Sequence, residues 1–167
     1  ASNNFIKVDS TQVKLGRPKQ WPAFAWDNSY GEEIHHVRPF SANENLICNG
    51  EFYEFVIDGG YNTKRYWGDD NSGINSWEWV QFGGMKMPTF WRGSIEDDKI
   101  GLRLRMIFEE VPMQWDWPVI VNYHEAKAYS KWKSEKDQSD VPYRLITEKE
   151  HNAKRSTAQS THDAINR

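Results

Sequence analysis

The pattern of apolar and polar positions predicts four short strands in this chain. We expect them at residues 5–8, 12–16, 36–40 and 102–107. Pro39 cannot donate a hydrogen bond to a neighbouring strand, so the third strand is predicted to lie at the edge of a sheet. Arg103 and Arg105 fall on one face of the fourth strand, where we expect solvent or a partner.

A first helix is predicted to begin at Asn49, a residue type that serves well as an N-cap. Phe52, Phe55 and Val56 then recur at positions i, i+3 and i+4, which places their side chains on one helical face. The Gly59-Gly60 pair is typical of a helix end that needs a residue in the left-handed region. The helix is therefore expected to end there and to bury its aromatic face.

Two further helices are predicted from a repeated capping pattern. Asn122 is followed three residues later by Glu125, and Thr147 by Glu150, so each carboxylate can accept from the amide of its cap residue. A short apolar run before each cap is typical of a buried strand or extended segment. The buried stripe of the second helix is expected to comprise Ala126, Tyr129 and either Trp132 or Lys133. The apolar pattern of the third helix fades after Ala153.

Loops and terminal segments are expected to make up much of the remaining chain. We predict a lead-in at residues 1–11, an aromatic loop at 18–30, a long ordered loop at 61–99 and a polar tail at 156–167. The loop at 61–99 is rich in Gly, Asn and Asp. Its Trp residues nevertheless favour order, because disordered segments are poor in aromatic residues.

The composition indicates a single domain with an aromatic core. The 167 residues have a mean hydropathy of −0.85, and only 38% are hydrophobic. Aromatic residues reach 14%, with nine Trp, and their large rings offset the shortage of aliphatic side chains. The net charge of −3 does not favour binding to nucleic acid or to an anionic membrane. No apolar run is long enough to cross a membrane, and the chain does not start like a signal peptide.

Histidine spacing does not favour a metal site in this chain. The five histidines are His35, His36, His124, His151 and His162. Non-haem iron needs two or three imidazoles that converge on one point, and no His-x-x-x-His spacing is present. His35 and His36 diverge if they lie on a strand, and His124 and His151 fall in the first turns of two predicted helices. We interpret all five as surface or capping residues and assign no metal ligand.

Cys48 is the single cysteine, which excludes an intramolecular disulfide and a cysteine-based zinc site. We interpret it as a small buried residue just before the first helix. No Gly-x-Ser-x-Gly, Gly-x-Gly-x-x-Gly or Walker pattern occurs, so hydrolase, dinucleotide and phosphate sites have no support. We therefore assign no catalytic residue and no cofactor-binding residue.

Acidic clusters and tryptophan pairs each have a structural and a functional interpretation. The clusters Asp69-Asp70-Asn71 and Glu96-Asp97-Asp98 lack the Asp-x-Asp-x-Asp-Gly spacing of a calcium loop, so we favour solvated charges over a calcium site. The pairs Trp77/Trp79 and Trp115/Trp117 would suit a sugar or a cation, but core packing is favoured because aliphatic residues are few. If each pair is extended, its rings face opposite ways and one of them is exposed.

Two groups of ordered motifs resemble the formylglycine-generating-enzyme (sulfatase-modifying factor) superfamily. One group comprises Asp116–Ala126 and Tyr143–Asn152, and the other comprises Asn49–Val56, Asp58–Tyr61, Tyr66-Trp67, Trp77–Trp79 and Pro88–Trp91. Phe24–Asn28 separately fits a Phe-x-Trp-Asp/Gly-Asn element of relatives. The resemblance extends from about Val13 to Arg155. The second group is similar to the branch fused to iron-dependent sulfoxide synthases of ergothioneine and ovothiol biosynthesis. Asn122-Tyr123-His124 and Glu150-His151 favour the ovothiol type, 5-histidylcysteine sulfoxide synthase.

This resemblance implies a loop-rich α+β fold of the C-type-lectin-like (sulfatase-modifying-factor) kind. Family members continue with a further segment rich in glycine and tryptophan. We therefore expect residues 1–167 to form the N-terminal two-thirds of one domain that is incomplete at its C-terminus. The catalytic tyrosine of the family would lie in that further segment, and we match it to no tyrosine of this chain.

The resemblance also implies a parent oxidoreductase that uses Fe(II) and O2 to join cysteine sulfur to the histidine ring in the cytoplasm. Many such parents carry a methyltransferase domain. Their iron ligands belong to a preceding helical-bundle domain. The expected partners of this chain are therefore that domain, the C-terminal remainder, and the substrates cysteine and histidine.

This piece would shape the substrate cleft, bind no iron and be inactive alone. Two alternatives remain open, namely an ergothioneine-type synthase domain and a non-catalytic lectin-like binding module. A copper-dependent formylglycine-generating oxidase is disfavoured, because that class uses a pair of cysteines and this chain has only Cys48.

Overall fold

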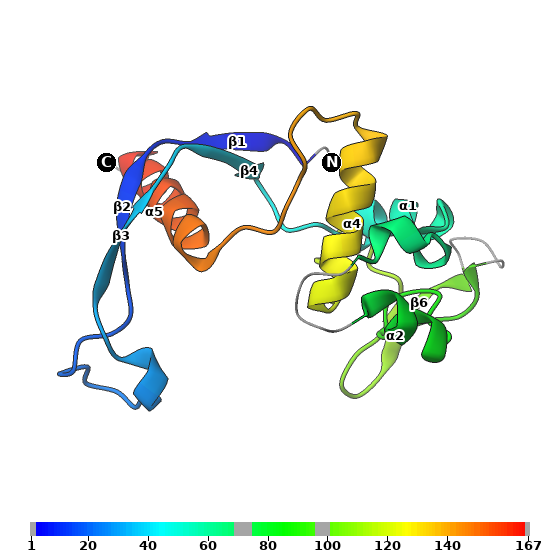
Figure 1. Cartoon of the computed structure of the whole chain (residues 1–167). Helices are drawn as coiled ribbons and strands as arrows, with labels where there is room; N and C mark the ends of the chain where they lie inside the picture. The colour runs from blue at the N-terminus through cyan, green and yellow to red at the C-terminus, as the bar shows by residue number, and fades with distance from the viewer. Residues whose placement is uncertain (1–2, 69–74, 96–100, 166–167) are drawn as a thin grey trace. The chain divides into compact units, whose positions relative to one another are not determined.

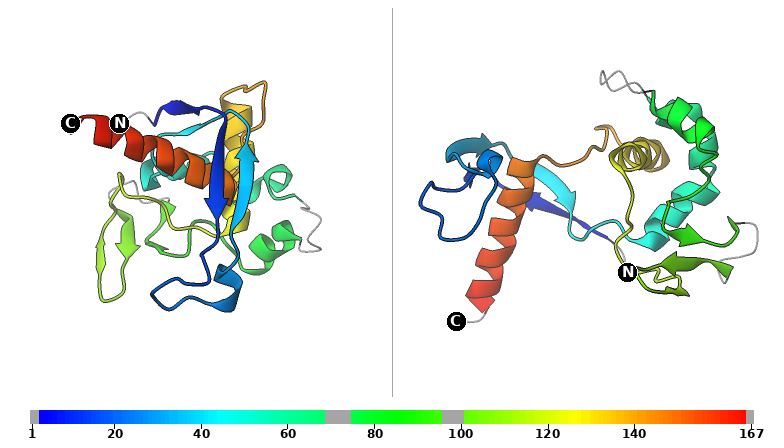
Figure 2. Two further views of the ribbon diagram at one scale, coloured as in Figure 1. Left: turned by 90° about the vertical axis from the view of Figure 1, so that its left-hand side faces the viewer. Right: turned by 90° about the horizontal axis from the view of Figure 1, so that it is seen from below.

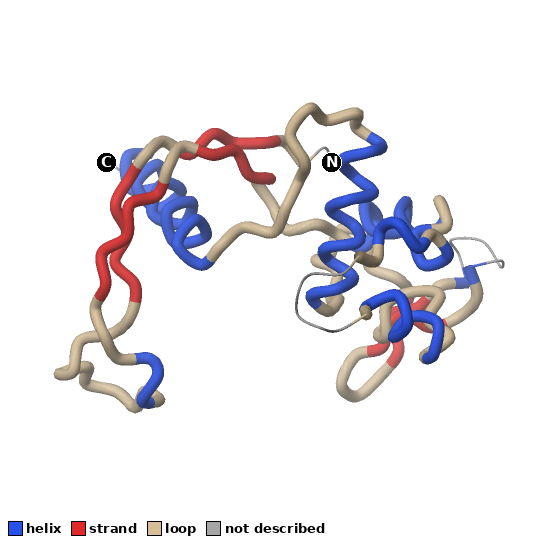
Figure 3. Tube along the Cα trace, in the orientation of Figure 1, coloured by secondary structure: helices blue, strands red, loops and turns tan. Residues whose placement is uncertain are grey.

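The computed structural model describes residues 3–68, 75–95 and 101–165, with residues 158–165 described by their backbone alone (Figure 1). The chain forms two compact units. Unit 1 comprises residues 1–45 and 146–167, and unit 2 comprises residues 46–145. Both units combine helices with short antiparallel strands (Figure 3). The predicted α+β class is confirmed at this level.

Unit 1 is built from two antiparallel ribbons and one long helix. Strand β1 (Phe5–Val8) pairs with β4 (Phe40–Asn43), β2 (Thr11–Leu15) pairs with β3 (Glu33–Val37), and α5 covers Glu148–Ile165. Helix α5 packs against β1, β2 and β3, and Figure 2 shows it beside the β2–β3 ribbon. The buried core of the unit is small and consists of Val8, Val13, Val37 and Ala153, with Leu15 and Phe40 at its edge.

The connection from β2 to β3 depends on a glycine. Gly16 has φ +82°, a left-handed conformation that L side chains rarely adopt, and a Cβ there would collide with the Gly31 carbonyl. The two segments of the loop stay close just beyond Gly16, since Gly31 N donates to Arg17 O at 3.2 Å. The short 3-10 helix η1 (Asp27–Ser29) follows in the long loop. The loop therefore returns in register with β3.

Unit 2 contains three α-helices, two 3-10 helices and a three-stranded sheet among its described residues. The elements are α1 (Asn49–Ile57), η2 (Gly60–Asn62), η3 (Lys64–Tyr66), α2 (Ser76–Phe82), β5 (Trp91–Arg92), β6 (Arg103–Arg105), β7 (Glu110–Pro112) and α4 (Tyr123–Lys136). The strand order is β5-β6-β7, and both pairs are antiparallel. Helix α4 contacts α1, η2 and η3.

Aromatic rings form the core of unit 2, as the composition predicts. The Phe52 ring stacks on Tyr129 with centroids 5.3 Å apart, and Phe55 meets Trp132 edge-on at 5.6 Å. Trp91 is almost fully buried and completes the cluster at the sheet. Offset and edge-on ring pairs add about 0.5–1.5 kcal/mol each beyond the area they bury. The rings thus attach α4 to α1.

The start of α4 matches the predicted capping box. Asn122 Oδ1 accepts from Glu125 N at 2.9 Å, and Glu125 Oε2 accepts from Asn122 N at 2.8 Å. The expected stripe is correct at Tyr129 and Trp132. It is wrong at its first position, because Ala128 is buried there and Ala126 is only half-buried. Lys133 forms an ion pair with Asp137 and is not part of the stripe.

The start of α5 is also confirmed, but its predicted end is wrong. Thr147 N donates to Glu150 Oε2 at 2.8 Å, which reproduces the expected cap. The helix then continues to Ile165, through the predicted polar tail at 156–167. No Gly or Pro occurs after Ala153 to stop it, and a polar sequence can remain helical without an apolar stripe.

The predicted N-cap of α1 is wrong by one residue. Cys48 occupies the cap position, and its amide donates to Glu51 Oε2 at 2.9 Å. Asn49 instead belongs to the helix, and its buried side chain links α1 to the rest of the unit. Its Nδ2 donates to Gln114 O at 2.8 Å, and its Oδ1 accepts from Trp91 Nε1 at 3.2 Å. Asn49 therefore serves long-range packing and does not cap the helix.

The prediction of a continuous loop at 61–99 is wrong within its described part. This stretch contains η2, η3, α2 and β5. Helix α2 has its own cap, since Asn75 Oδ1 accepts from Glu78 N at 3.2 Å and Asn75 Nδ2 donates to Glu78 Oε1 at 2.8 Å. Trp77 and Trp79 consequently lie on a helix and not on an extended segment.

Two predicted strands are shorter than expected. β3 ends at Val37, and Pro39 lies between β3 and β4, so the predicted strand at 36–40 is wrong. Strand β6 covers only Arg103–Arg105, but its alternation is confirmed because both arginines are exposed and Leu104 is buried.

The apolar run before the second helix is confirmed as an extended segment, whereas the run before the third helix is not the buried strand that the prediction allows. Pro118 bridges to Cys48, and Val119 N donates to Ile47 O at 3.0 Å, so the first run is an extended segment. Leu145 and Ile146 are exposed to 38% and 40%, so the second run is not a buried strand.

Candidate functional site

The histidines of the described residues do not come together as ligands of a common metal ion. His35 and His36 are neighbours on β3, where His35 Nε2 lies 3.2 Å from Glu33 and His36 Nε2 lies 3.3 Å from Ser10 Oγ. His124 and His151 occupy the first turns of α4 and α5, as predicted. The side chain of His162 lies outside the described residues. Across residues 3–68, 75–95 and 101–157, no three His, Cys, Asp or Glu side chains gather in a way that could hold a metal ion.

One ring of each tryptophan pair is more exposed than the other, although Trp77 and Trp79 lie on a helix and not on the extended segment that the prediction assumes. Trp79 is exposed to 36% and Trp117 to 44%, whereas Trp77 and Trp115 pack against the core of unit 2. Cys48 lies just before α1 as expected but is half-buried. The acidic clusters Asp69-Asp70-Asn71 and Glu96-Asp97-Asp98 lie outside the described residues, so both interpretations of them stay open.

A buried tyrosine–glutamate pair joins η2 to the start of α4. Tyr61 OH donates to Glu125 Oε1 at 2.5 Å, while Glu125 Oε2 accepts from Asn122 N. Both side chains are 2% exposed. One carboxylate therefore caps a helix and also binds a hydroxyl that lies 64 residues away in sequence. The sequence predicts the capping role, but no local pattern indicates Tyr61.

Burial determines the charge behaviour of this pair. Desolvation raises the pKa of Glu125, and the hydrogen bonds from Tyr61 and Asn122 oppose that rise. Burial also raises the pKa of Tyr61 well above its usual range, and the adjacent Glu125 charge adds to the effect. Tyr61 therefore remains a protonated donor at neutral pH. Because both groups are enclosed, we assign them a structural role and not acid–base chemistry.

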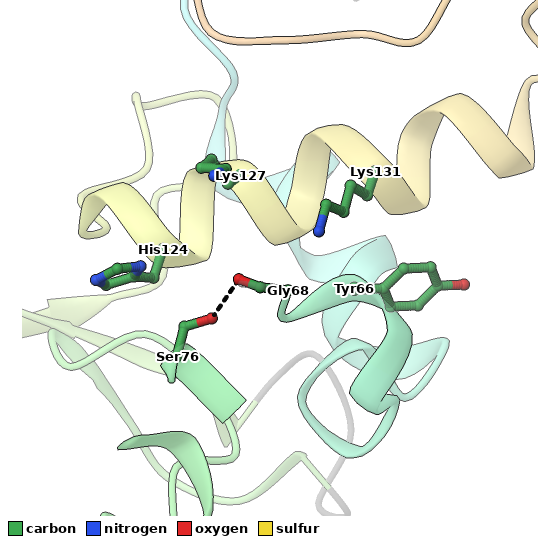
Figure 4. Close-up of a pocket in the computed structure, with 6 residues that line it drawn as sticks. All are labelled: Tyr66, Gly68, Ser76, His124, Lys127 and Lys131. Atoms are coloured by element: carbon green, nitrogen blue, oxygen red, sulfur yellow. Dashed lines mark hydrogen bonds between the residues drawn. The ribbon is translucent and has the colours of Figure 1, made fainter. Parts of the chain in front are cut away.

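The outward side of α4 carries a row of cationic and polar side chains. His124, Lys127 and Lys131 extend from the helix, and Tyr66, Gly68 and Ser76 lie across from them (Figure 4). Ser76 Oγ donates to Gly68 O at 3.4 Å. The space between the two sides is too small to hold a water molecule. This depression does not form a substrate pocket among the described residues.

A larger groove lies on the same helix, beside the segment that follows it. It has a volume of about 220 Å³ and is lined by Tyr123, Lys127, Ser130, Lys131, Tyr143, Arg144 and Leu145. Tyr143 N donates to Ser134 Oγ at 2.7 Å and holds the second wall against α4. The lining residues that the structure describes include Lys127, Lys131 and Arg144 and no carboxylate.

The fold and the capped helices, taken with a family comparison, define the class of protein. The chain is α+β, with small antiparallel sheets, a tryptophan-rich core and box-capped helices. It belongs to the sulfatase-modifying factor family, because the model of the sulfatase-modifying factor enzyme 1-like domain matches residues 4–162. Among the described residues, no helix combines the length and apolar character that a membrane span requires.

Three curated relatives are all hercynine oxygenases. The protein of Mycobacterium tuberculosis is 31% identical over 121 residues, which cover 70% of this chain and 25% of the relative. The proteins of Mycolicibacterium thermoresistibile and Mycolicibacterium smegmatis are each 29% identical, over 72% and 70% of this chain and 24% and 25% of their own lengths. The chain thus spans about a quarter of the length of the relatives it matches.

Proposed function

We propose that this chain is part of a non-haem iron sulfoxide synthase of the ovothiol type, in which it shapes one wall of the substrate cleft. The observation that carries the proposal is the family match over residues 4–162 combined with similarity to hercynine oxygenases. The motifs Asn122-Tyr123-His124 and Glu150-His151 support the ovothiol type within that group. The parent would act in the cytoplasm, and some parents would also carry a methyltransferase domain.

The proposed fold is the C-type-lectin-like arrangement of the sulfatase-modifying-factor domain. Short antiparallel strands, three helices of eight or more residues and long connections, all within the described residues, agree with this arrangement. Residues 1–167 would form the N-terminal two-thirds of that domain. The partners of the chain would then be the C-terminal remainder and a helical-bundle domain.

The described residues do not fit the iron centre of such an enzyme, because they contain no group of converging ligands. We therefore assign the Fe(II) to the helical-bundle domain and derive no step at the metal from this chain. The overall reaction balances as one cysteine thiol, one histidine ring C–H and one O2 giving one aryl sulfoxide and one water. The C–S bond forms, sulfur is oxidised, and O2 takes up four electrons.

Product analysis of the full-length protein tests the proposal. The protein would be incubated with Fe(II), O2 and cysteine, together with either histidine or hercynine, and the products identified by mass spectrometry. We expect 5-histidylcysteine sulfoxide from histidine, and no product from the 167-residue chain alone. A sulfoxide formed from hercynine but not from histidine would replace the ovothiol type with the ergothioneine type. No sulfoxide from either acceptor would refute the proposed function.

The ergothioneine-type alternative is favoured by the relatives, whose names specify hercynine. A lectin-like binding module is favoured only by the exposed rings of Trp79 and Trp117. Titration with mono- and disaccharides, with and without calcium, separates this second alternative. Saturable quenching of tryptophan fluorescence would support a binding module, and its absence would leave the enzyme proposals ahead.

A further inference from the structure

The turn that joins β6 to β7 exposes apolar side chains to solvent. Its residues are Met106, Ile107, Phe108 and Glu109, whereas hairpin turns ordinarily consist of Gly, Asn, Asp, Pro or Ser. Ile107 is exposed to 89% and Phe108 to 96%. The loop projects from the sheet of unit 2 (Figure 1). Large apolar groups thus lie in water at a position where polar residues are the usual choice.

Hydrogen bonds hold this turn in a defined conformation. Met106 N donates to Glu109 O at 2.8 Å, and Arg105 N donates to Phe90 O at 2.8 Å. Leu104, two residues before the turn, is buried in the aromatic core and fixes the hairpin to unit 2. The turn is therefore a preformed surface, which a partner can bind without first having to order it.

Phe90 extends the apolar surface from the neighbouring strand. Its carbonyl accepts from the amide of Arg105, so Phe90 lies directly beside the end of β6, and its side chain is exposed to 40%. The term hairpin-tip surface here means Phe90, Met106, Ile107 and Phe108. Soluble proteins rarely leave neighbouring apolar groups exposed unless another surface covers them.

The area of the hairpin-tip surface limits what can cover it. A fully exposed side chain of this size presents on the order of 200 Å², so the four residues together can bury about 500 Å². A stable complex of two separate chains buries about 800 Å² on each partner. A smaller contact persists when both sides belong to one polypeptide, because a tether keeps the effective concentration in roughly the millimolar range. The area therefore favours an intramolecular partner over a second copy.

The curated relatives contain enough additional chain to supply such a partner. This chain spans about a quarter of their length, so most of each relative lies outside the region that it matches. A lipid surface suits the hairpin tip less well. Glu109 and Glu110 directly follow the apolar residues, and an anionic membrane would repel them.

We propose that the hairpin-tip surface docks into an apolar recess of the same polypeptide that lies outside residues 1–167. Ile107 and Phe108 would enter the recess, and Phe90 and Met106 would pack at its rim. The inference rests on the proposed function only in taking this chain as part of a longer enzyme. It assigns to unit 2 a contact with the remainder of that enzyme.

Photo-cross-linking of the full-length protein tests this contact. p-Benzoylphenylalanine would replace Phe108, whose 96% exposure leaves room for the larger side chain, and the cross-linked peptides would be identified by mass spectrometry. We expect cross-links within one polypeptide to residues outside 1–167. A cross-link that joins two copies, a cross-link confined to residues 1–167, or the absence of any cross-link would each overturn the proposal.

A double variant separates docking from folding. Ile107→Ser with Phe108→Ser should change the Tm of the 167-residue chain by less than about 1 °C, because both side chains are exposed there. In the full-length protein the same variant should lower the Tm by roughly 5 °C, because a buried apolar contact is lost. Val141→Ser removes another exposed side chain of unit 2 and is the matched control, with no change expected in either protein. Equal losses of Tm in the two proteins, or no loss in the full-length protein, would contradict docking.

Sedimentation with vesicles tests the lipid alternative. Vesicles of phosphatidylcholine and phosphatidylserine should not carry down the full-length protein, and sedimentation that the double variant abolishes would overturn the proposal. The cross-link and the Tm need neither iron nor O2 nor substrate. A full-length protein that forms no sulfoxide can still show the cross-link, so this proposal and the proposed function fail independently.

Discussion

Removing the hydroxyl of Tyr61 tests how much the buried pair with Glu125 stabilises unit 2. In Tyr61→Phe, Glu125 Oε1 loses its donor while Oε2 keeps the Asn122 amide. A hydrogen bond to a charged group contributes about 1.5–3 kcal/mol, and a buried acceptor without a donor costs a similar amount. Since both side chains are 2% exposed, water cannot replace the lost donor. We expect the variant to lose about 2 kcal/mol of unfolding free energy.

Urea unfolding at pH 7.5, followed by fluorescence of the buried Trp91 and Trp132, measures this loss. Tyr129→Phe is the matched control, because its ring lies in the same core and its hydroxyl makes no hydrogen bond with the described residues. We expect the control to change stability by less than about 0.5 kcal/mol. If Tyr61→Phe changes the stability as little as Tyr129→Phe does, the Tyr61–Glu125 hydrogen bond does not stabilise unit 2 and our reasoning about this buried pair is wrong.

Three further predictions concern the buried carboxylate, a turn and a cap. Burial raises the native pKa of Glu125 above its ordinary value of 4.5, so the native state binds more protons than the unfolded state above that pH. As the pH rises above 4.5, the free energy of unfolding of the wild type should therefore fall relative to that of Glu125→Gln. Urea unfolding from pH 4 to 8 measures this difference between the two proteins, and a difference that does not change with pH would contradict the raised pKa. Gly16→Ala should destabilise unit 1 by at least about 2 kcal/mol, because residue 16 has a positive φ and the new Cβ would clash with Gly31. Amide hydrogen exchange in β2 and β3 should become faster, and unchanged exchange would contradict the prediction. Asn75→Ala should cost about 1 kcal/mol and increase amide exchange in α2, whereas unaffected α2 amides would show that the cap is dispensable.

The sequence predicts those parts of the fold that short-range chemistry determines. Asn122 with Glu125 and Thr147 with Glu150 are three residues apart, so the helix starts can be predicted from spacing alone. Asn75 and Glu78 have the same spacing, but the surrounding Gly, Asn and Asp residues favour a loop, so composition conceals the start of α2. A capping pair is thus a stronger indicator than the composition of its neighbours.

Contacts between distant residues could not be predicted. Tyr61 and Glu125 are 64 residues apart, and Asn49 and Gln114 are 65 apart, so nothing in their local sequence indicates that they meet. The local sequence around Asn49 favours a cap for this reason, although its side chain lies in the core. The groove on α4 depends in the same way on Tyr143 returning to Ser134 after a polar turn. The local sequence pattern correctly predicts the histidines of the first helical turns, but it does not indicate this groove.

The order of the two units along the chain has an energetic consequence. Residues 46–145 interrupt unit 1, so α5 and the four strands on which its core depends arrive from opposite ends of a long insertion. When the insertion is folded, the separation of its own two ends is fixed. When it unfolds, it becomes a flexible tether of about 100 residues, and closing such a tether costs about 4 kcal/mol of entropy. A substitution that unfolds the aromatic core of unit 2 should therefore also destabilise the small core of unit 1, solely because the two units share one chain.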